Sequence, residues 1–563
     1  MYVLGLNTGV HDSSAALLRD GALCQLVEQE RLSRRKHAVF QTPREAIQAC
    51  LDAEGITLSS VDAIAVGWDI GSTPLRGSRR FTSEGMRAWL FPDEPPGSLP
   101  PLRWVSHHLA HAASAYYSGG ADRAAVIVVD GAGETQASSL YRGAGGKLEL
   151  LREWPITQSL GFYYGLAAEW VGLDLHFGAG KLMGLAAYGR RRDGASLHRC
   201  ASGYEIAATR DDGDQPRLGA DPRKLGLDVP HTMVAAVREE FAGLYPYLPR
   251  AGEDAISYAD FAATIQEALN DALYGLAAEA RQLADAPDLV VAGGVAMNCS
   301  AIGRLARTGI FDRVYVPPVP TDAGVSLGAA LVVAAEHDPF VPTAITHAYW
   351  SDGFTVDSAA AAVAGTGLVS RRLDADRLPA VAAAAVAEGR IVGWARGRAE
   401  IGQRALGARS IVADPRDRHS LERLNRLKGR EMWRPVAPSV LAEHAGELFD
   451  GPVPEPARFM LSATQVRPDA RRRVPAVTHV DGSARPQLVE RATNPGYWHL
   501  IDEFRALTGI PAVVNTSFNL ADEPIVYTAA NSVATYLRSD LDLLVLDDLL
   551  VARSEMDLSA LCG

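Results

Sequence analysis

The chain has 563 residues, of which 47% are apolar and 22% are charged. This is the composition of a folded globular protein, and the chain is too long for a single hydrophobic core, so we expect two or three domains. The formal net charge of -12 argues against a nucleic-acid backbone as the principal partner, because phosphate binding normally requires a basic surface.

The five cysteines are scattered and form no Cys-X-X-Cys pair, so neither a disulfide framework nor a zinc ribbon is predicted. The longest apolar stretch near the C-terminus, 541–552, is interrupted by aspartates, and no uncharged run is long enough to cross a membrane. The first residues form a strand pattern and not a charged leader. We therefore expect a soluble cytoplasmic protein without a membrane partner, and the sequence leaves its oligomeric state open.

Two segments, 2–21 and 125–143, share one pattern: an apolar strand, a polar turn that contains glycine, and a second half-buried strand. Such duplicated hairpins resemble the phosphate loops of the actin and sugar-kinase superfamily, although unrelated hairpins can look alike. A glycine pair further along also lets a backbone approach a ligand without interference from a Cβ atom. The residues that we expect to contact a nucleotide are Gly131, Gly133, Lys181, Gly293, Gly294 and Asn298.

His107 and His111 lie in an alanine-rich segment that favours a helix, so both imidazoles should project from one face about one turn apart. A histidine pair with this spacing can bind a metal ion, although alone it more often packs or faces solvent. Asp130 and Asp322 each follow an apolar run and are expected at the carboxyl end of a buried strand, where open α/β sheets place ligands. Two imidazoles and two carboxylates would suit iron(II), manganese or zinc, and ligand type alone does not choose among them.

Helical periodicity extends over 260–283 and 325–336. The stretch 340–356 is rich in proline, threonine and glycine, which predicts a domain boundary there. We therefore expect one domain at 1–345 and a second at 357–563.

The second domain carries a basic segment in an otherwise acidic chain, after a predicted helix at 378–388 and a predicted strand at 390–394. Its cations alternate with Gly, Trp, Pro and Ser instead of with acids. Guanidinium groups match the oxygens of phosphate or carboxylate, so we favour an anion-binding site over an ordinary solvated face. The cations are Arg396, Arg398, Arg404, Arg409, Arg416, Arg418, Lys428, Arg430 and Arg434.

Motifs along nearly the whole chain together resemble those of the NodU/CmcH-type O-carbamoyltransferase family. They occur at 7–17, 28–37, 107–117, 130–134, 180–189, 293–298, 317–328, 402–410, 433–439 and 515–519. Each motif is weak by itself, whereas their common order is specific. One position departs from the pattern: Gln403 stands where family members commonly have proline, which leaves Arg404 in place but in a less rigid loop.

The resemblance implies an α/β protein with an N-terminal duplicated actin/sugar-kinase-like domain and a C-terminal YrdC-like α/β domain. In this family the C-terminal domain converts carbamoyl phosphate and ATP to carbamoyl adenylate, with Mg²⁺ as the usual companion of ATP. The N-terminal domain then transfers the carbamoyl group to a hydroxyl of a small-molecule acceptor, such as an antibiotic or another secondary metabolite.

The resemblance also implies roles for individual residues. Iron(II), or another divalent metal, would be bound by His107, His111, Asp130 and Asp322. His11 would be the base at the acceptor hydroxyl, because an alcohol is a poor nucleophile at neutral pH; the alternative is a turn histidine with a structural hydrogen bond. The residues implied to hold carbamoyl phosphate and the adenylate are Arg404, Lys428, Arg434, Arg485, Asn515 and Ser517.

Two other functions remain open. A metal-dependent kinase of the actin/sugar-kinase superfamily would form ADP and not AMP, but it would not require the basic segment of the second domain. A nucleotide-binding component of an RNA-modifying assembly is disfavoured by the acidic balance of the chain, and salt-sensitive tRNA binding would support it.

Overall fold

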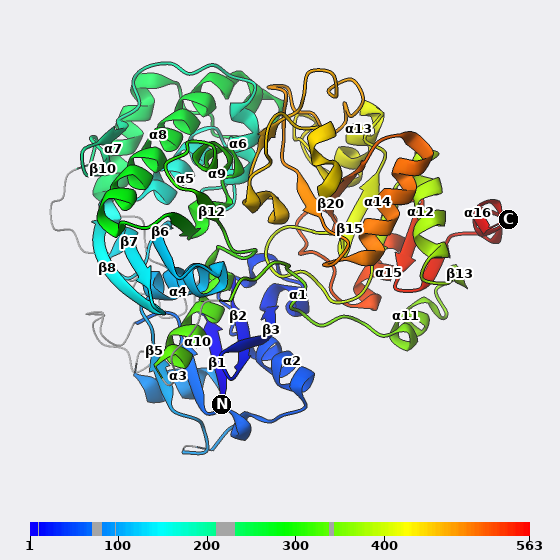
Figure 1. Cartoon of the computed structure of the whole chain (residues 1–563), viewed down its shortest axis with the longest axis horizontal. Coiled ribbons are helices and arrows are strands. Elements are labelled where there is room, and N and C mark those ends of the chain that lie inside the picture. The colour runs from blue at the N-terminus through cyan, green and yellow to red at the C-terminus, as the bar shows by residue number, and fades with distance from the viewer. Residues whose placement is uncertain are drawn as a thin grey trace. The chain divides into compact units, whose positions relative to one another are not determined.

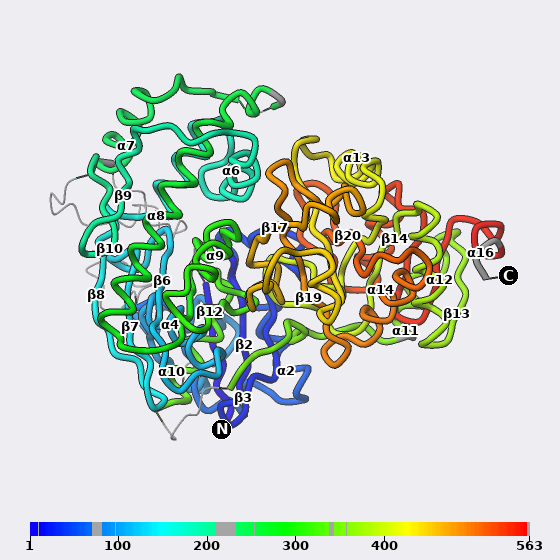
Figure 2. Tube along the Cα trace, turned by 45° about the horizontal axis from the view of Figure 1, so that its top comes forward, coloured from blue at the N-terminus to red at the C-terminus, as the bar shows by residue number. Residues whose placement is uncertain are grey.

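The computed structural model describes residues 1–8, 11–69, 82–95, 97–209, 231–250, 252–336 and 343–562. The chain divides into two compact units, unit 1 (Met1–Ile345) and unit 2 (Thr346–Gly563), and each combines β-sheet with helices (Figures 1 and 2). The predicted α/β fold class is therefore confirmed. Within the described residues, no helix combines the length and the apolar character that crossing a membrane would require.

Unit 1 contains two five-stranded sheets with the same topology. In each, three consecutive strands pair antiparallel, and two later strands add in parallel beside the first. The first sheet comprises β1 (Tyr2–Asn7), β2 (Ser14–Arg19), β3 (Ala22–Glu28), β4 (Ala63–Val66) and β5 (Leu102–Trp104), in the order β3-β2-β1-β4-β5. The second comprises β6 (Arg123–Val129), β7 (Gln136–Ala144), β8 (Lys147–Pro155), β11 (Asp288–Ala292) and β12 (Arg313–Tyr315), in the order β12-β11-β6-β7-β8. The duplication predicted from the two hairpins is confirmed.

Two helices pack against each other between these sheets (Figure 1). α4 (His107–Gly119) contacts β6, β7 and β11, whereas α10 (Val325–Ala335) contacts β1, β2 and β4. Glycines allow the close approach: a Cβ atom at Gly328 would overlap the carbonyl oxygen of Ala110, and one at Gly5 would overlap that of Ser326. The residues that begin α4 and α10 are thereby held next to each other, although they are about two hundred residues apart in sequence.

The other faces of the two sheets are covered by α2 (Arg44–Glu54) and α8 (Ala259–Ala284). Strand side chains alternate between the two faces. In β1, Leu4 and Leu6 join the apolar core shared with α2, whereas Gly5 faces α10. The helices predicted at 260–283 and 325–336 are α8 and α10, and each agrees with the prediction to within one residue at either end.

Unit 2 is built around one mixed eight-stranded sheet. Its strands are β13 (Val369–Arg372), β14 (Val392–Ala395), β15 (Arg409–Ala413), β16 (Ala437–Leu441), β19 (Gln487–Val489), β20 (Ala512–Ser517), β21 (Leu543–Leu546) and β22 (Leu549–Ala552), in the order β13-β22-β21-β14-β15-β20-β16-β19. α12 (Arg377–Ala387) packs against α14 (Pro495–Thr508), and α11 (Val356–Val363) packs against α15 (Ala529–Leu537). The predicted helix at 378–388 and strand at 390–394 are α12 and β14.

Candidate active site

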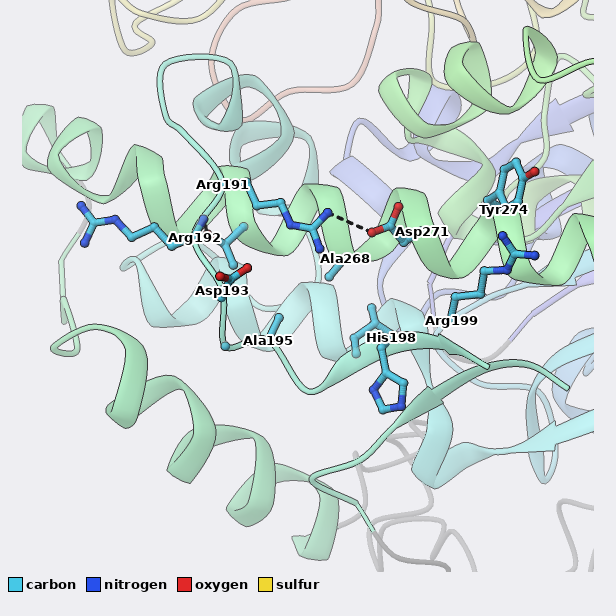
Figure 3. Close-up of a pocket in the computed structure, with 12 residues that line it drawn as sticks. Arg191, Arg192, Asp193, Ala195, His198, Arg199, Ala268, Asp271 and Tyr274 are labelled. Atoms are coloured by element: carbon cyan, nitrogen blue, oxygen red, sulfur yellow. Dashed lines mark hydrogen bonds and ion pairs between the residues drawn. The ribbon is translucent and has the colours of Figure 1, made fainter. Parts of the chain in front are cut away.

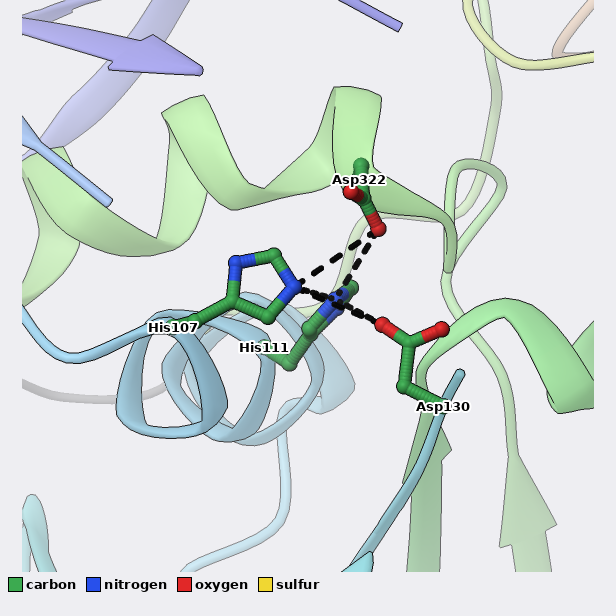
Figure 4. A group of neighbouring side chains, drawn as sticks. All are labelled: His107, His111, Asp130 and Asp322. Atoms are coloured by element: carbon green, nitrogen blue, oxygen red, sulfur yellow. Dashed lines mark hydrogen bonds and ion pairs between the residues drawn. The ribbon is translucent and has the colours of Figure 1, made fainter. Parts of the chain in front are cut away.

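Four side chains of unit 1 converge on one point and form a group that we call the metal cluster: His107, His111, Asp130 and Asp322 (Figure 4). All four are buried, and one ligand atom from each lies within 4.8 Å of the others. The two histidine Nε2 atoms are 3.2 Å apart. Oδ2 of Asp130 lies 3.0 Å from Nε2 of His111, and Oδ1 of Asp322 lies 3.6 Å from both Nε2 atoms. This donor set fits a divalent cation.

The histidines owe their positions to the first turns of α4, which begins at His107. The carboxylate of Glu134 accepts hydrogen bonds from the backbone N–H of His107 at 2.9 Å and from that of Asp69 at 2.8 Å. A carboxylate at a helix N-terminus satisfies donors that the helix leaves unpaired and interacts favourably with the helix dipole. Glu134 therefore anchors the start of α4, a role that the sequence prediction missed because Glu134 lies 27 residues from its partner.

Backbone groups orient the ligand atoms of the metal cluster. Oδ1 of Asp130 accepts from the N–H of Gly131 at 2.8 Å and from that of Gly294 at 3.1 Å, which leaves Oδ2 to face the histidines. Nδ1 of His107 lies 3.2 Å from the carbonyl oxygen of Gly67. A carbonyl only accepts, so Nδ1 carries a proton, and Nε2 is the nitrogen that would bind a metal ion once its own proton is displaced.

The glycines that were predicted to contact a nucleotide shape the backbone near the metal cluster, and Asn298 caps the helix that follows. Gly293 has a left-handed φ of 93°, and a Cβ atom there would overlap the carbonyl oxygen of Val129. The N–H of Gly133 donates to the carbonyl oxygen of Gln136 in the turn before β7. Asn298 caps α9 (Cys299–Ala306) by accepting from the N–H of Ala301 at 3.0 Å.

Asp322 reaches the metal cluster from a different position than the sequence predicted. β12 ends at Tyr315, and Asp322 opens a short 3-10 turn (Asp322–Gly324) that leads into α10. The intervening stretch, 316–321, contains prolines 317, 318 and 320, which lack the N–H that a sheet ladder requires. The carboxylate is therefore delivered by the start of a helix and not by the end of a strand.

The electrostatics of the metal cluster favour an added positive charge. Burial opposes protonation of His107, yet Asp322 and Asp130 together raise its pKa to about 10. Burial also favours neutral carboxyls, but the two histidines hold the pKa of Asp130 well below its usual range. Without another cation, protonated imidazole offsets the two buried carboxylates; a divalent cation would supply that charge instead.

His11 lies beside the metal cluster, in the turn between β1 and β2 where Asn7 pairs with Ser14. Its Nε2 is 3.9 Å from Oδ2 of Asp322, and its Nδ1 is 3.2 Å from Oδ2 of Asp12. Burial lowers the pKa of His11, but Asp322 and Asp12 outweigh it and raise the pKa to about 9. A cation bound by Asp322 would weaken that attraction and favour the neutral imidazole that a base requires.

In unit 2, the structure brings Lys428 and Ser517 together. Lys428 follows α13 (Arg418–Leu427), and Ser517 ends β20. Nζ of Lys428 donates to the carbonyl oxygen of Ser517 at 2.6 Å and to that of Asn519 at 3.0 Å, and it lies 2.7 Å from Oδ1 of Asn519. Its buried ammonium thus secures the chain that leaves β20.

Arg434 and Arg485 form a second group, to which the structure adds Arg430; we call these three residues the arginine cluster. Burial, together with the charges of Arg434 and Arg485, lowers the pKa of Arg430 to about 9. Burial also lowers the pKa of Arg434, where Arg485 adds to the effect and Glu431 opposes it. Three guanidinium groups close enough to repel one another favour an anionic ligand.

Asn515 and Arg404 belong to neighbouring segments. Nδ2 of Asn515 donates to the carbonyl oxygen of Ala405, the residue after Arg404, at 3.1 Å, and to Oγ of Ser439 at 2.9 Å. Among the described residues, the buried Oδ1 of Asn515 has no hydrogen-bond partner. This oxygen is an acceptor that a ligand could satisfy.

Two cations of the basic segment do not form part of an anion site. Arg409 is buried, and its guanidinium donates to four carbonyl oxygens, those of Tyr527, Arg396, Ala408 and Gly397. Arg416 pairs with Asp414 at 2.6 Å. Both side chains therefore have structural partners, which the alternation of residue types in the sequence did not reveal. Lys181, in α6 (Ala179–Ala186), is half-buried.

Unit 1 also has a pocket of about 440 Å³ against α8 (Figure 3). Arg191 pairs with Asp271 at 3.0 Å, and the guanidinium of Arg199 lies 4.5 Å from the ring centre of Tyr274. The described residues that line this pocket include none of those predicted from the sequence to bind metal or nucleotide. We therefore treat it as distinct from the candidate active site.

Known proteins match this chain over both units. The solved structure of an activator of the 2-hydroxyisocaproyl-CoA dehydratase from Clostridium difficile with bound ADPNP is 14% identical and covers 60% of this chain and 95% of its own, with a TM-score of 0.35. Residues 2–73 and 96–331 match a family model described as Carbamoyltransferase N-terminus, and residues 383–553 match one described as Carbamoyltransferase C-terminus.

Two curated relatives extend the sequence match over most of the chain. Nodulation protein NolNO of Sinorhizobium fredii (strain NBRC 101917 / NGR234) is 35% identical over 571 residues, which cover 97% of this chain and 80% of that protein. Nodulation protein U of the same strain is 30% identical over 558 residues, which cover 92% of this chain and 94% of that protein.

Proposed function

This chain belongs to the carbamoyltransferase family, and from that membership we propose an ATP-dependent O-carbamoyltransferase that works in two steps. The observation that carries the proposal is that each half matches its own family model and each buries its own charged cluster, the metal cluster in one and the arginine cluster in the other. The chain is a transferase enzyme; the adenylate intermediate and the acceptor are the parts that we propose.

In the first step, residues 357–563 convert carbamoyl phosphate, ATP and one water molecule to carbamoyl adenylate, pyrophosphate and phosphate. Water cleaves carbamoyl phosphate to carbamate and phosphate, and a carbamate oxygen then attacks the α-phosphorus of ATP, from which pyrophosphate leaves. Both substrates are anions and repel each other, so positively charged groups are needed to bind them together. Arg430, Arg434 and Arg485 supply three such charges. We assign Arg404, Asn515 and Ser517 to the same site, with Lys428 as the residue that holds the chain at Ser517. Oδ1 of Asn515 offers an acceptor for the amide of the carbamoyl group.

In the second step, residues 1–345 transfer the carbamoyl group to a hydroxyl of a small molecule, which we propose to be an antibiotic or another secondary metabolite. Nε2 of His11 accepts the hydroxyl proton while the oxygen attacks the carbamoyl carbon. The bond from that carbon to the phosphate oxygen breaks, and AMP leaves with the electron pair.

The residues proposed to hold a divalent cation, iron(II) or another metal, are His107, His111, Asp130 and Asp322. When bound, the cation supplies positive charge for the oxygen that becomes negative during the attack, and no electron transfer is involved. Gly131, Gly133, Gly293, Gly294, Asn298 and Lys181 are proposed to lie near the nucleotide, where backbone and ammonium groups suit phosphate oxygens.

The purified full chain, given ATP, carbamoyl phosphate and a panel of alcohols, tests the proposal. We expect AMP and pyrophosphate as products, together with an alcohol whose mass has increased by one carbamoyl unit. ADP as the sole nucleotide product would indicate a kinase instead. Salt-sensitive tRNA binding without carbamoyl transfer would indicate a component of an RNA-modifying assembly.

A further inference from the structure

Asp12 lies between two histidines at the edge of the metal cluster. Its Oδ2 is 3.2 Å from Nδ1 of His11, and its Oδ1 is 2.9 Å from Nδ1 of His37. The carboxylate is about 10% exposed, and hydrogen bonds to a largely buried carboxylate are stronger than those at the surface. With Nδ1 of His11 engaged in this way, the ring presents Nε2 toward Asp322.

The backbone holds Asp12 in a conformation that non-glycine residues rarely adopt. Its φ is 51°, a left-handed conformation that aspartate tolerates better than most non-glycine residues. Hydrogen bonds on both sides stabilise it: the N–H of Asp12 donates to the carbonyl oxygen of His37 at 2.6 Å, and Nδ2 of Asn7 donates to the carbonyl oxygens of His11 at 3.2 Å and of Asp12 at 3.1 Å. These hydrogen bonds fix the backbone of Asp12 and with it the direction of its carboxylate.

His37 fixes the carboxylate from the other side. Its backbone N–H donates to Oε2 of Glu30 at 2.6 Å. Its ring stacks on Phe177 with the centroids 3.9 Å apart and the planes at 11°. The rings of Phe177 and His11 are also nearly perpendicular, at 81°, with the centroids 6.4 Å apart. Asp12 therefore cannot turn away from His11 without losing its bond to an anchored ring.

We propose that Asp12 is the positioning residue for His11. Its carboxylate accepts the Nδ1–H of His11 and thereby selects the tautomer in which Nε2 carries the lone pair that faces the acceptor hydroxyl. A buried carboxylate orients the histidine base of Ser-His-Asp triads in the same way. The inference rests on the proposed function, because it requires His11 to be the base.

A second metal site at Asp12, Glu30 and His37 is the competing interpretation, since these side chains also lie close enough together to share an ion. However, Oδ1 of Asp12 is already bonded to His37, and Oε2 of Glu30 is bonded to the N–H of His37. A cation bound through Nδ1 of His37 would have to displace the hydrogen bond between that atom and Asp12. The group is therefore better explained as a hydrogen-bonded support for His11.

Asp12→Asn is the appropriate test, because asparagine has the same size and tolerates positive φ. Its amide can donate to Nδ1 of His11 and so favour the wrong tautomer. We expect the rate of carbamoyl transfer at saturating acceptor to fall about 100-fold to 10,000-fold. The KM for the acceptor should change less than about threefold, which is smaller than the tenfold change that corresponds to one pKa unit. AMP-forming activation of carbamoyl phosphate should persist.

Asp20→Asn is the matched control. Asp20 also has a φ of 51°, but its side chain is 76% exposed and pairs with the amino terminus. Transfer by this variant should equal that of the unmodified protein. His11→Asn should lose transfer, and the double variant Asp12→Asn/His11→Asn should be no slower than His11→Asn, because two residues that act through one group are not additive.

Unimpaired transfer by Asp12→Asn, or a double variant slower by the product of the two single effects, would overturn the inference. A second readout does not depend on activity. In protein labelled with ¹⁵N at histidine and studied at a pH above the His11 pKa of about 9, where the ring is neutral, the His11 resonances, assigned with His11→Asn, should show the proton on Nδ1, and Asp12→Asn should move it to Nε2. A proton on Nε2 in the unmodified protein also refutes the inference. Absence of transfer by the unmodified protein would instead refute the proposed function, while the resonances still test the role of Asp12.

Discussion

The two units bury charged clusters of opposite sign. In unit 1, two carboxylates meet two imidazoles, and the carboxylates raise the pKa of His107 to about 10. In unit 2, three guanidinium groups meet, and burial together with mutual repulsion lowers the pKa of Arg430 to about 9. Buried charge is costly unless it is paired. The comparison therefore indicates that unit 1 is suited to bind a cation and unit 2 is suited to bind an anion.

The two clusters also differ in how the chain supports them. Each carboxylate of the metal cluster begins or follows a regular element, and backbone N–H groups of Gly131 and Gly294 orient Asp130. The arginine cluster instead lies on connecting segments, where Arg430 is held by a hydrogen bond from Nε to Oδ1 of Asn425 at 2.5 Å. Rigid elements suit the fixed geometry that a metal ion requires, whereas connecting segments can adjust to larger substrates.

The largest effect is expected from Asp322→Ala. The variant lacks a direct cation ligand, so metal affinity should fall more than the roughly 10-fold to 100-fold typical for loss of a supporting residue. Carbamoyl transfer should fall about 100-fold to 1000-fold, which is typical for loss of a group that stabilises developing charge. Adenylate formation should persist, since it belongs to unit 2. Elemental analysis and separate assays of the two steps measure these effects.

His107→Ala should behave in the same way, and Asp122→Ala, at an exposed position, serves as the control. Full metal occupancy in both Asp322→Ala and His107→Ala would contradict the assignment of a cation to unit 1.

Arg434→Ala should have the next largest effect, and this effect should be on the reaction of unit 2. Loss of one charge-assisted contact to a bound anion costs about 2–5 kcal/mol, so the KM for carbamoyl phosphate should rise at least about 30-fold. The variant should still transfer from supplied carbamoyl adenylate. Arg426→Ala, on the exposed face of α13 and close to Arg430 in sequence, is the control. Normal ATP turnover by Arg434→Ala would remove this residue from the site.

The smallest effect is expected in thermal unfolding of the full chain. A chelator should lower the unfolding temperature of unit 1, and inorganic phosphate should raise that of unit 2. A ligand at 100 times its Kd stabilises by about 2.7 kcal/mol, which corresponds to a shift of several degrees. Arg430→Gln should reduce the phosphate effect by about half or more, because one of three cationic groups is lost.

Calorimetry distinguishes the two units if the chelator effect is absent in Asp322→Ala and the phosphate effect is absent in Arg434→Ala. Ligands that shift the same transition would show that the two clusters do not act separately.

Local spacing was sufficient to predict half of the metal cluster. His107 and His111 share a helical face wherever an alanine-rich segment forms a helix, and α4 begins at His107. Periodicity likewise predicted α8 and α10, and the hairpin pattern predicted two sheets of one topology. The order of motifs identified the family, whose models match both halves of the chain. These features depend either on residues that are close together in the sequence or on the order of motifs along it. A sequence contains both kinds of information.

Tertiary packing decided which distant groups meet. Asp322 reaches the histidines because Gly328 lets α10 lie close against α4, and no local pattern specifies that contact. Packing likewise directed the ammonium of Lys428 to carbonyl oxygens, enclosed Arg409, and grouped Arg430 with Arg485. The physical reason is that residue type limits what a side chain can bind, whereas its partner depends on which backbone segments approach within hydrogen-bonding distance.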